Sequence, residues 1–231
     1  MNKLLGMTAL AGVFALGGGW VLPQGDAVIL SGAAMAQEAA AEAATTEAEA
    51  ETAESPAVEE MFIGSIDAPV TVIEYGSYTC PHCANFHENQ YQSLKTDYID
   101  TGKVKFIFRE VYFDRFGLWA SMIARCGGAE RYFGIHDILY STQNDWIAGG
   151  QDPALIAANL RTIGLQAGLE GEQVDACMAD EASARALVTW FEENMTADEV
   201  TGTPTLFIDG TKYSNMSYDE MKPLIEAALA E

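Results

Sequence analysis

Short runs of β-branched and aromatic residues alternate with longer stretches of helical periodicity. The runs predict buried strands over 70–75, 104–108 and 205–208. Between the first two, Phe86, Leu94 and Tyr98 form an apolar stripe that predicts a helix, which runs from Pro81 toward Thr101-Gly102. A strand, a helix and a strand with a crossover of this length are typical of a parallel βαβ unit.

Strand signals vanish over 116–195, where the pattern becomes helical and Asp152-Pro153 resembles a helix start. After the third strand, Asp209-Gly210 favours a hairpin turn into Lys212-Tyr213. Ser217 and Glu220 match a capping box that would open a last helix, but Pro223 lies inside it and predicts a later start. The order predicts one α/β domain in two parts, 61–115 and 196–231, split by a helical insertion over 116–195.

The first sixty residues do not resemble the rest of the chain. One Lys, an apolar stretch over 4–16 and the small-residue site Ala34-Met35-Ala36 predict a secretory signal peptide over 1–36. An uncleaved membrane anchor over 4–22 is the alternative. Residues 37–60 are rich in Ala and Glu, with eight glutamates and no basic residue, and predict a disordered acidic tether.

The charge balance excludes several classes of function. Lys and Arg number 12 and Asp and Glu 34, so the net charge is −22. Phosphate recognition needs clusters of basic residues, so no nucleic-acid partner is expected. Hydrophobic residues at 49% and charged residues at 20% are typical of a globular protein.

The motif Cys80-Pro81-His82-Cys83 lies directly after a predicted strand, at the start of a predicted helix. Two intervening residues on the first helical turn bring the sulfurs within disulfide reach. The helix N-terminus stabilises a thiolate and lowers the pKa of Cys80, and His82 would lower it further. Cys80 is thus predicted as the attacking sulfur and Cys83 as the resolving thiol.

Half of a zinc site is the alternative, but it needs a second ligand pair. The other cysteines, Cys126 and Cys177, stand alone and 51 residues apart, so redox chemistry is favoured and no metal is expected. In an oxidising compartment these two favour a structural disulfide. Free buried thiols or a second redox pair are the alternatives.

Residues 62–231 resemble the DsbA family of exported thiol:disulfide oxidoreductases. The resemblance rests on the strand that ends in Glu74-Tyr75, the CPHC motif, the helical insertion and Gly202-Thr203-Pro204-Thr205. It implies a thioredoxin-like α/β fold with an inserted α-helical domain. The Pro-His pair between the cysteines is the one found in strongly oxidising members.

The resemblance also implies roles for three further residues. Pro204 matches the family's cis-proline, which faces the CxxC motif, and Thr203 precedes it at the position that tunes the potential. Glu74 matches a buried acid that relays a proton for the resolving cysteine. The residue pattern alone favours an edge-strand carboxylate for Glu74, and the resemblance reverses that preference.

The resemblance thus implies a periplasmic enzyme that donates its Cys80–Cys83 disulfide to reduced, unfolded exported proteins. A DsbB-type inner-membrane oxidase would regenerate it, and no cofactor is expected. A monomer is favoured, because the acidic tether stands where isomerases carry a dimerisation domain. An isomerase or reductase of the same fold is one alternative, and a metal-binding or client-binding protein is another.

Two histidines outside the motif are assigned no chemistry. His87, one helical turn after Cys83, is expected at the surface. His136, among aromatic residues, is expected to be a partly buried histidine with satisfied hydrogen bonds rather than a ligand.

Overall fold

The computed structural model describes residues 56–231. The predicted signal peptide and most of the predicted tether lie outside the described residues. Among the described helices, none is long and apolar enough to cross a membrane.

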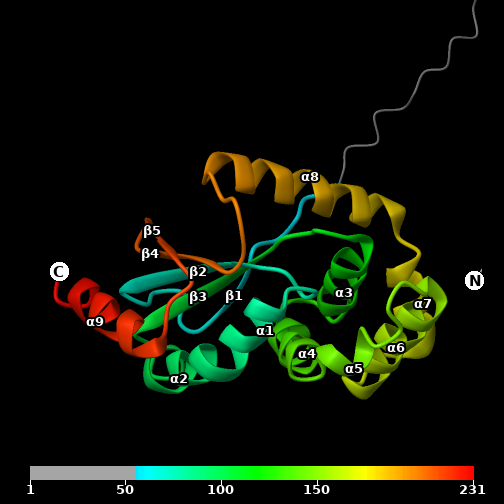
Figure 1. The fold of residues 1–231 in the computed structure, drawn as a ribbon, viewed down its shortest axis with the longest axis horizontal. Coiled ribbons are helices and arrows are strands. Elements are labelled where there is room, and N and C mark those ends of the chain that lie inside the picture. Colours follow the sequence, from blue (N-terminus) through cyan, green and yellow to red (C-terminus); the bar gives the residue numbers. More distant parts are fainter. Residues whose placement is uncertain (1–55) are drawn as a thin grey trace, which may run out of the picture. The chain divides into compact units, whose positions relative to one another are not determined.

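A five-stranded mixed sheet forms the centre of this part of the chain (Figure 1). Its strands are β1 (Met61–Ile63), β2 (Val70–Gly76), β3 (Val104–Glu110), β4 (Thr205–Ile208) and β5 (Thr211–Ser214). They lie in the order β1-β3-β2-β4-β5, with β2 and β3 parallel and the other pairs antiparallel. The predicted parallel βαβ unit is therefore confirmed, and β1 is a strand that the sequence did not predict.

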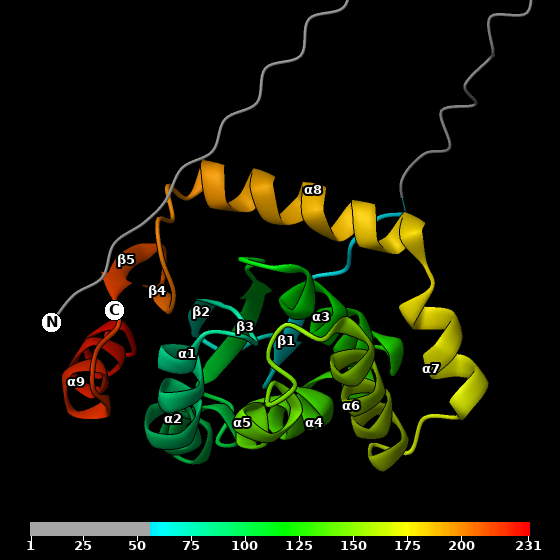
Figure 2. The same cartoon turned by 45° about the vertical axis from the view of Figure 1, so that its right-hand side comes forward.

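A continuous helical run connects β2 to β3. It consists of α1 (Pro81–Phe86), the π-helical turn η1 (His87–Tyr91), α2 (Gln92–Leu94) and a second π-helical turn, η2 (Lys95–Ile99). The helices that follow β3 are α3 (Arg115–Cys126), α4 (Ala129–Ser141), α5 (Gln143–Trp146), α6 (Pro153–Gln166), α7 (Gly171–Met178) and α8 (Glu181–Ala197). Helix α8 then leads from the end of α7 back toward β4 (Figure 2).

The last elements match local signals in the sequence. Asp209 and Gly210 have φ values of 44° and 79° and connect β4 to β5 in the predicted two-residue turn. Helix α9 (Tyr218–Ala228) begins directly after Ser217, which forms the full capping box with Glu220. The prediction that Pro223 would delay this helix was wrong, because the capping box stabilises the first turn despite a proline further along.

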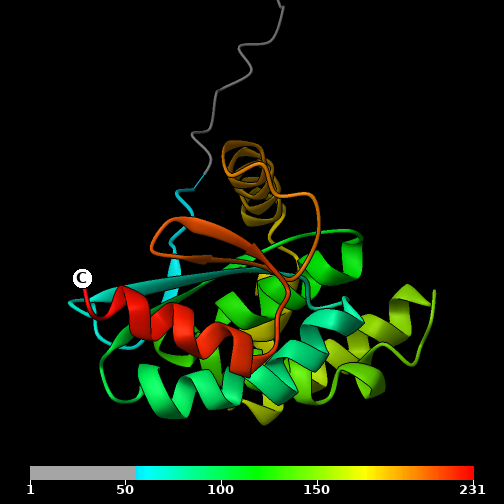
Figure 3. The same ribbon diagram turned by 60° about the vertical axis from the view of Figure 1, so that its left-hand side comes forward.

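The two faces of the sheet carry different layers. Helix α8 crosses one face, and α1, α2 and α9 lie on the other (Figures 1 and 3). Along β2, Val70 and Val72 belong to the main core, whereas Tyr75 belongs to a smaller cluster with Phe207. Since side chains alternate along a strand, Glu74 points toward the main core and α1.

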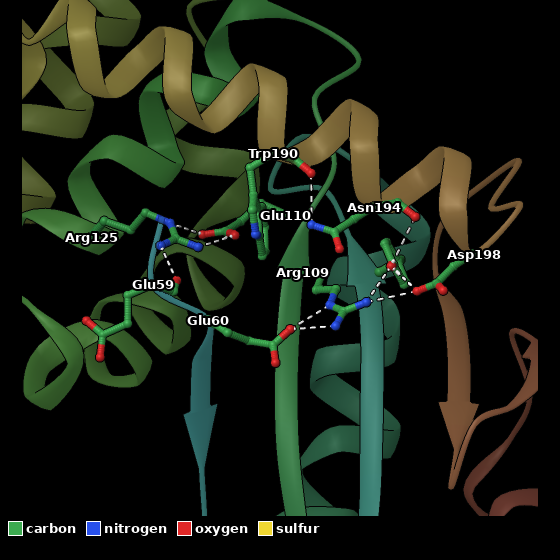
Figure 4. Close-up of polar contacts among 9 residues, drawn as sticks. Glu59, Glu60, Arg109, Glu110, Arg125, Trp190, Asn194 and Asp198 are labelled. Atoms are coloured by element: carbon green, nitrogen blue, oxygen red, sulfur yellow. Dashed lines mark hydrogen bonds and ion pairs between the residues drawn. The ribbon is translucent and has the colours of Figure 1, made fainter. Parts of the chain in front are cut away.

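Two arginines, one on the sheet and one on α3, bind the residues before β1 (Figure 4). The Arg109 guanidinium on β3 pairs with the Glu60 carboxylate at 2.7 Å and with the Asp198 carboxylate, after α8, at 2.8 Å. Arg125 on α3 donates to the Glu59 carbonyl oxygen at 2.8 Å. Glu59 and Glu60, predicted as the end of the tether, thus contact the folded domain because both arginines offer them partners.

Arg125 also forms a buried ion pair with Glu110 at the end of β3. Two parallel hydrogen bonds of 2.7 Å join its guanidinium to the Glu110 carboxylate, which is only 1% exposed. The Tyr132 hydroxyl donates a third hydrogen bond of 2.7 Å to the same carboxylate. This group anchors α3 and α4 of the insertion to the sheet.

We expect the variant Arg125→Met to lower the free energy of unfolding by about 3–5 kcal/mol, because it leaves the Glu110 carboxylate buried without its cation. Urea unfolding followed by circular dichroism measures this loss. The matched variant Arg109→Met should cost about 1 kcal/mol, since the partners of Arg109 are partly exposed. Equal losses in the two variants would contradict this assignment of the buried pair.

Cys126 at the end of α3 and Cys177 on α7 form a disulfide with their Cα atoms 5.8 Å apart. The sequence separation of 51 residues makes the closed loop long. We expect the double variant Cys126→Ala/Cys177→Ala to lower the free energy of unfolding by about 4 kcal/mol, because the unfolded chain gains entropy without the bridge. The difference should disappear when both proteins are unfolded under reducing conditions, and its persistence there would argue for lost packing instead.

Candidate active site

The end of β2, a short loop and the start of α1 position the cysteine pair. Cys80 is the N-cap of α1, and Pro81 occupies the first helical position, where its missing N–H costs no hydrogen bond. The Cys80 amide donates to the Ser77 carbonyl oxygen at 3.0 Å. These local bonds place the first sulfur at the helix N-terminus.

Two residues that sequence reasoning missed hold this loop from the helices that follow β3. The Gln143 side-chain amide on α5 donates to the carbonyl oxygens of Tyr78 at 2.8 Å and Cys80 at 3.0 Å. Asp114, which caps α3, accepts a hydrogen bond of 2.8 Å from the Thr79 hydroxyl. Both contacts join segments far apart in the sequence, so no local pattern could have indicated them.

The two sulfurs differ in exposure and in acidity. Both cysteines are free thiols, Cys80 8% exposed and Cys83 fully buried. A hydrogen bond from the Cys83 thiol is the largest cause that lowers the pKa of Cys80, to about 5, and Thr203 and the backbone N–H groups of His82 and Cys83 lower it further. Burial raises the pKa of Cys83 well above that of an ordinary thiol. Cys80 is therefore a thiolate at neutral pH, and Cys83 keeps its proton.

Thr203 and Pro204 face the cysteine pair from the segment before β4. The peptide bond between them is cis. The Cys80 thiol donates to the Thr203 carbonyl oxygen at 3.7 Å. The Thr203 hydroxyl oxygen is buried and has no partner within the described part of the chain, so it is free to donate to a thiolate.

Glu74 lies in the interior, near both sulfurs. It is 1% exposed and sits on β2, which is a central strand, so the edge-strand position favoured by the residue pattern alone is wrong. Burial raises the pKa of Glu74 well above its usual range, and the negative charge of Cys80 raises it further. Glu74 in turn raises the pKa of Cys83, so protonation at Glu74 responds to the redox state of the pair.

The exposed position expected for His87 is wrong. His87 is 4% exposed and stacks on the rings of Tyr91 and Tyr140 at centroid distances of 4.8 and 5.1 Å. It lies four residues after Cys83 in the helical run, so it shares the buried face of that residue. His136 on α4 is fully buried rather than partly buried, and its Nε2 atom has no hydrogen-bond partner in the described part of the chain. Both histidines therefore belong to the interior beside α1.

A groove of about 740 Å³ runs beside the cysteine helix. Pro81 at the start of α1, His87 at the start of η1 and Asp137 on α4 line it. Gln143, which holds the Cys80 carbonyl oxygen, also borders this groove. The groove therefore runs from the start of the cysteine helix at Pro81 to the buried His87.

A family model and several curated proteins match this chain. Residues 56–227 match the family model described as Thioredoxin. The putative protein-disulfide oxidoreductase of Rickettsia bellii is 32% identical over 173 residues, which cover 74% of this chain and 65% of that protein. The disulfide bond formation protein D of Bacillus subtilis is 27% identical over 178 residues, with 72% of this chain and 76% of that protein covered. The chain thus spans just under two thirds of the length of the rickettsial relative.

Among solved structures, alpha-DsbA1 of Wolbachia pipientis superimposes with a TM-score of 0.68 and 27% identity, covering 76% of this chain and 93% of that chain. BdbD of Bacillus subtilis has a TM-score of 0.66 at 24% identity, covering 74% and 94% of the two chains. The predicted fold class, a thioredoxin-like α/β fold with a helical insertion, is thereby confirmed.

The acidity of Cys80 has a measurable consequence in the reduced protein. Thiolate absorbance at 240 nm should titrate with a midpoint near pH 5. Because folding lowers this pKa, the thiolate stabilises the folded state. This contribution to the free energy of unfolding is complete above the ordinary thiol pKa of about 8.5, and it is lost as the pH falls through 5. Urea unfolding of the reduced protein between pH 4 and 8 should show this loss, whereas the oxidised protein, which has no thiol here, should not.

The Thr203 hydroxyl contributes to this acidity. The variant Thr203→Val should raise the titration midpoint above pH 5, because the valine cannot donate to the thiolate. The variant Thr203→Ser keeps the hydroxyl and should keep the midpoint. If both variants titrate like the parent protein, the Thr203 side chain does not stabilise the thiolate.

Proposed function

Since this chain belongs to the thioredoxin family, and its insertion is of the DsbA type, we propose that it is a thiol:disulfide oxidoreductase that works as a dithiol oxidase. The observation that carries the proposal is the contrast between the two sulfurs: an acidic thiolate at Cys80 and a buried neutral thiol at Cys83. Stabilising a thiolate stabilises the reduced state, which makes the disulfide a good electron acceptor.

The reaction begins from the oxidised enzyme. A substrate thiolate attacks the Cys80 sulfur, the more exposed of the two, and the bond between Cys80 and Cys83 breaks. A substrate–Cys80 disulfide forms, and Cys83 leaves with the electron pair. Because its pKa is raised, Cys83 takes up a proton, for which protonated Glu74 is the proposed donor.

The second step releases the product. A second substrate thiolate attacks the substrate sulfur of the mixed disulfide, and Cys80 leaves as a thiolate. Its low pKa makes it a good leaving group. The substrate has lost two electrons and gained one disulfide, and the enzyme holds both electrons as the Cys80 thiolate and the Cys83 thiol. The sulfurs carry both electrons, so this exchange requires no cofactor.

The proposed substrates are reduced, unfolded proteins exported to the periplasm, and the enzyme acts as a monomer. The groove beside α1 and the exposed position of Pro81 leave room for an extended chain next to Cys80. A DsbB-type membrane oxidase is the proposed acceptor that removes the two electrons and restores the Cys80–Cys83 disulfide. The disulfide between Cys126 and Cys177 fits an oxidising compartment of this kind.

The decisive experiment is the equilibrium reduction potential of Cys80–Cys83 in a glutathione series, with Cys126 and Cys177 followed separately by mass. We expect a potential well above that of the glutathione couple, because the reduced state is stabilised by the thiolate. A potential near or below that couple would overturn the oxidase proposal and favour an isomerase or reductase.

Two single variants check the order of attack. Cys83→Ala, incubated with glutathione disulfide, should retain glutathione on Cys80, because the resolving thiol is missing. Cys80→Ala should remain unmodified, since its remaining thiol is buried and protonated. Mass spectrometry distinguishes the two, and an adduct on Cys83 instead would contradict the assignment of Cys80 as the attacking sulfur.

A further inference from the structure

Three buried polar atoms that have no hydrogen-bond partner among residues 56–231 lie close to one another beside the groove. They are Nδ1 of His87, Nε2 of His136 and Oδ1 of Asp137. Each of the three residues also offers one metal-ligand atom, which for His87 is Nε2, and these ligand atoms lie within 4.8 Å of one another. Buried polar groups are nearly always paired, so a cluster of unpaired ones indicates a missing partner such as a water molecule or an ion.

A chain of hydrogen bonds decides which nitrogen of His136 carries the proton. The Glu110 carboxylate, paired with Arg125, accepts from the Tyr132 hydroxyl at 2.7 Å. Tyr132 in turn accepts from the Tyr78 hydroxyl at 3.3 Å. The Tyr78 oxygen lies 3.1 Å from His136 Nδ1 and, with its own proton already donated, can only accept from it.

His136 is therefore protonated on Nδ1 and presents a bare lone pair on Nε2. Histidines that bind metals commonly donate their other ring N–H to a neighbouring acceptor, which fixes the tautomer. The Tyr78–Tyr132–Glu110 chain supplies that acceptor here. The unpaired Nε2 is then in the form that binds a cation.

His87 and Asp137 complete the group. His87 Nε2 lies 3.3 Å from Asp137 Oδ1 and accepts a hydrogen bond of 3.2 Å from the Gln92 side-chain amide, which places the ring proton on Nδ1. An ion at this site would take the place of Gln92 at the Nε2 lone pair. Both rings lie in the interior, with His87 4% and His136 0% exposed, where the uncharged form is favoured. A neutral ring is the form that coordinates a metal.

The site can be reached from solvent without unfolding. His87 and Asp137 both line the groove of about 740 Å³, and the Asp137 side chain is 43% exposed. Two nitrogens and one carboxylate oxygen, with an open position toward water, form a donor set that suits Zn²⁺. Tetrahedral ligands around zinc lie about 3.3 Å apart, so the most distant donors must close by up to about 1.5 Å, and the partly exposed Asp137 can move.

We propose that His87, His136 and Asp137 bind one zinc ion at the groove, with the remaining coordination position open to water. The site is separate from the cysteine pair, so the proposal does not depend on the proposed oxidase activity. It also differs from the zinc alternative considered for the CPHC motif, because it uses no sulfur.

The test is a calorimetric titration of the oxidised protein with zinc chloride, since the Cys80–Cys83 disulfide prevents the thiols from binding metal. We expect one saturable site. Asp137→Asn and His87→Gln should each weaken the affinity at least tenfold, because each removes or weakens one ligand. Asp137 is partly exposed, so its variant should fold normally, and circular dichroism checks this.

Two matched variants serve as controls. Glu88→Gln removes an exposed charge that lines the same groove, and His82→Gln removes an exposed histidine beside Cys80. Both should keep the parent affinity. The absence of saturable zinc binding, equal affinity in Asp137→Asn, or loss of binding in His82→Gln would each overturn the proposal and leave buried water as the partner of the three atoms.

Discussion

Exclusion of water from the interior beside β2 and α1 controls the protonation of the buried groups around the cysteine pair. The same burial raises the pKa of Cys83 and Glu74 and lowers that of His87. Cys80 escapes this effect because it lies at the edge, where its hydrogen-bond donors outweigh its partial burial. The chemical difference between two cysteines three residues apart thus follows from their depth: Cys80 lies at the start of α1 among hydrogen-bond donors, and Cys83 lies one turn further into the core.

The helical insertion maintains this dry space and also positions the loop before α1. The buried pair of Arg125 and Glu110 anchors α3 to the end of β3, next to the strand that carries Glu74. Gln143 reaches from α5 to the Cys80 carbonyl oxygen. The insertion interrupts the α/β domain in the sequence, but in the folded protein it forms one side of the active site.

Local signals explain what could be predicted. The strands over 70–75 and 205–208, the Asp209-Gly210 turn and the Ser217 cap depend on residues close together in the sequence, and the structure contains each of them. The position of the cysteine pair at a helix start was likewise predictable from Pro81 and the preceding strand.

The features that were missed depend on contacts between distant segments. Strand β1 has only three residues and is defined by its pairing with β3 rather than by its own pattern. The roles of Gln143 and Arg125 depend on partners that no local pattern indicates. His87 is the exception, because its spacing of four residues from the resolving cysteine already indicated the buried face of the helix.

The opposite face of the sheet holds the segment that carries Thr203. The Asp198 carboxylate, at the end of α8, pairs with the Arg109 guanidinium (Figure 4). The Lys212 ammonium donates to the carbonyl oxygens of Asp198 and Glu199 at 2.9 and 2.6 Å. These contacts fix the start of the short connection that ends at the Thr203–Pro204 bond. The insertion thus holds the cysteine pair from one side. Contacts with β3 and β5 hold the segment of Thr203 and Pro204, which faces the cysteine pair, from the other side. Because both sides are attached to the same sheet, the distance between Cys80 and Thr203 is a property of the whole domain rather than of either loop.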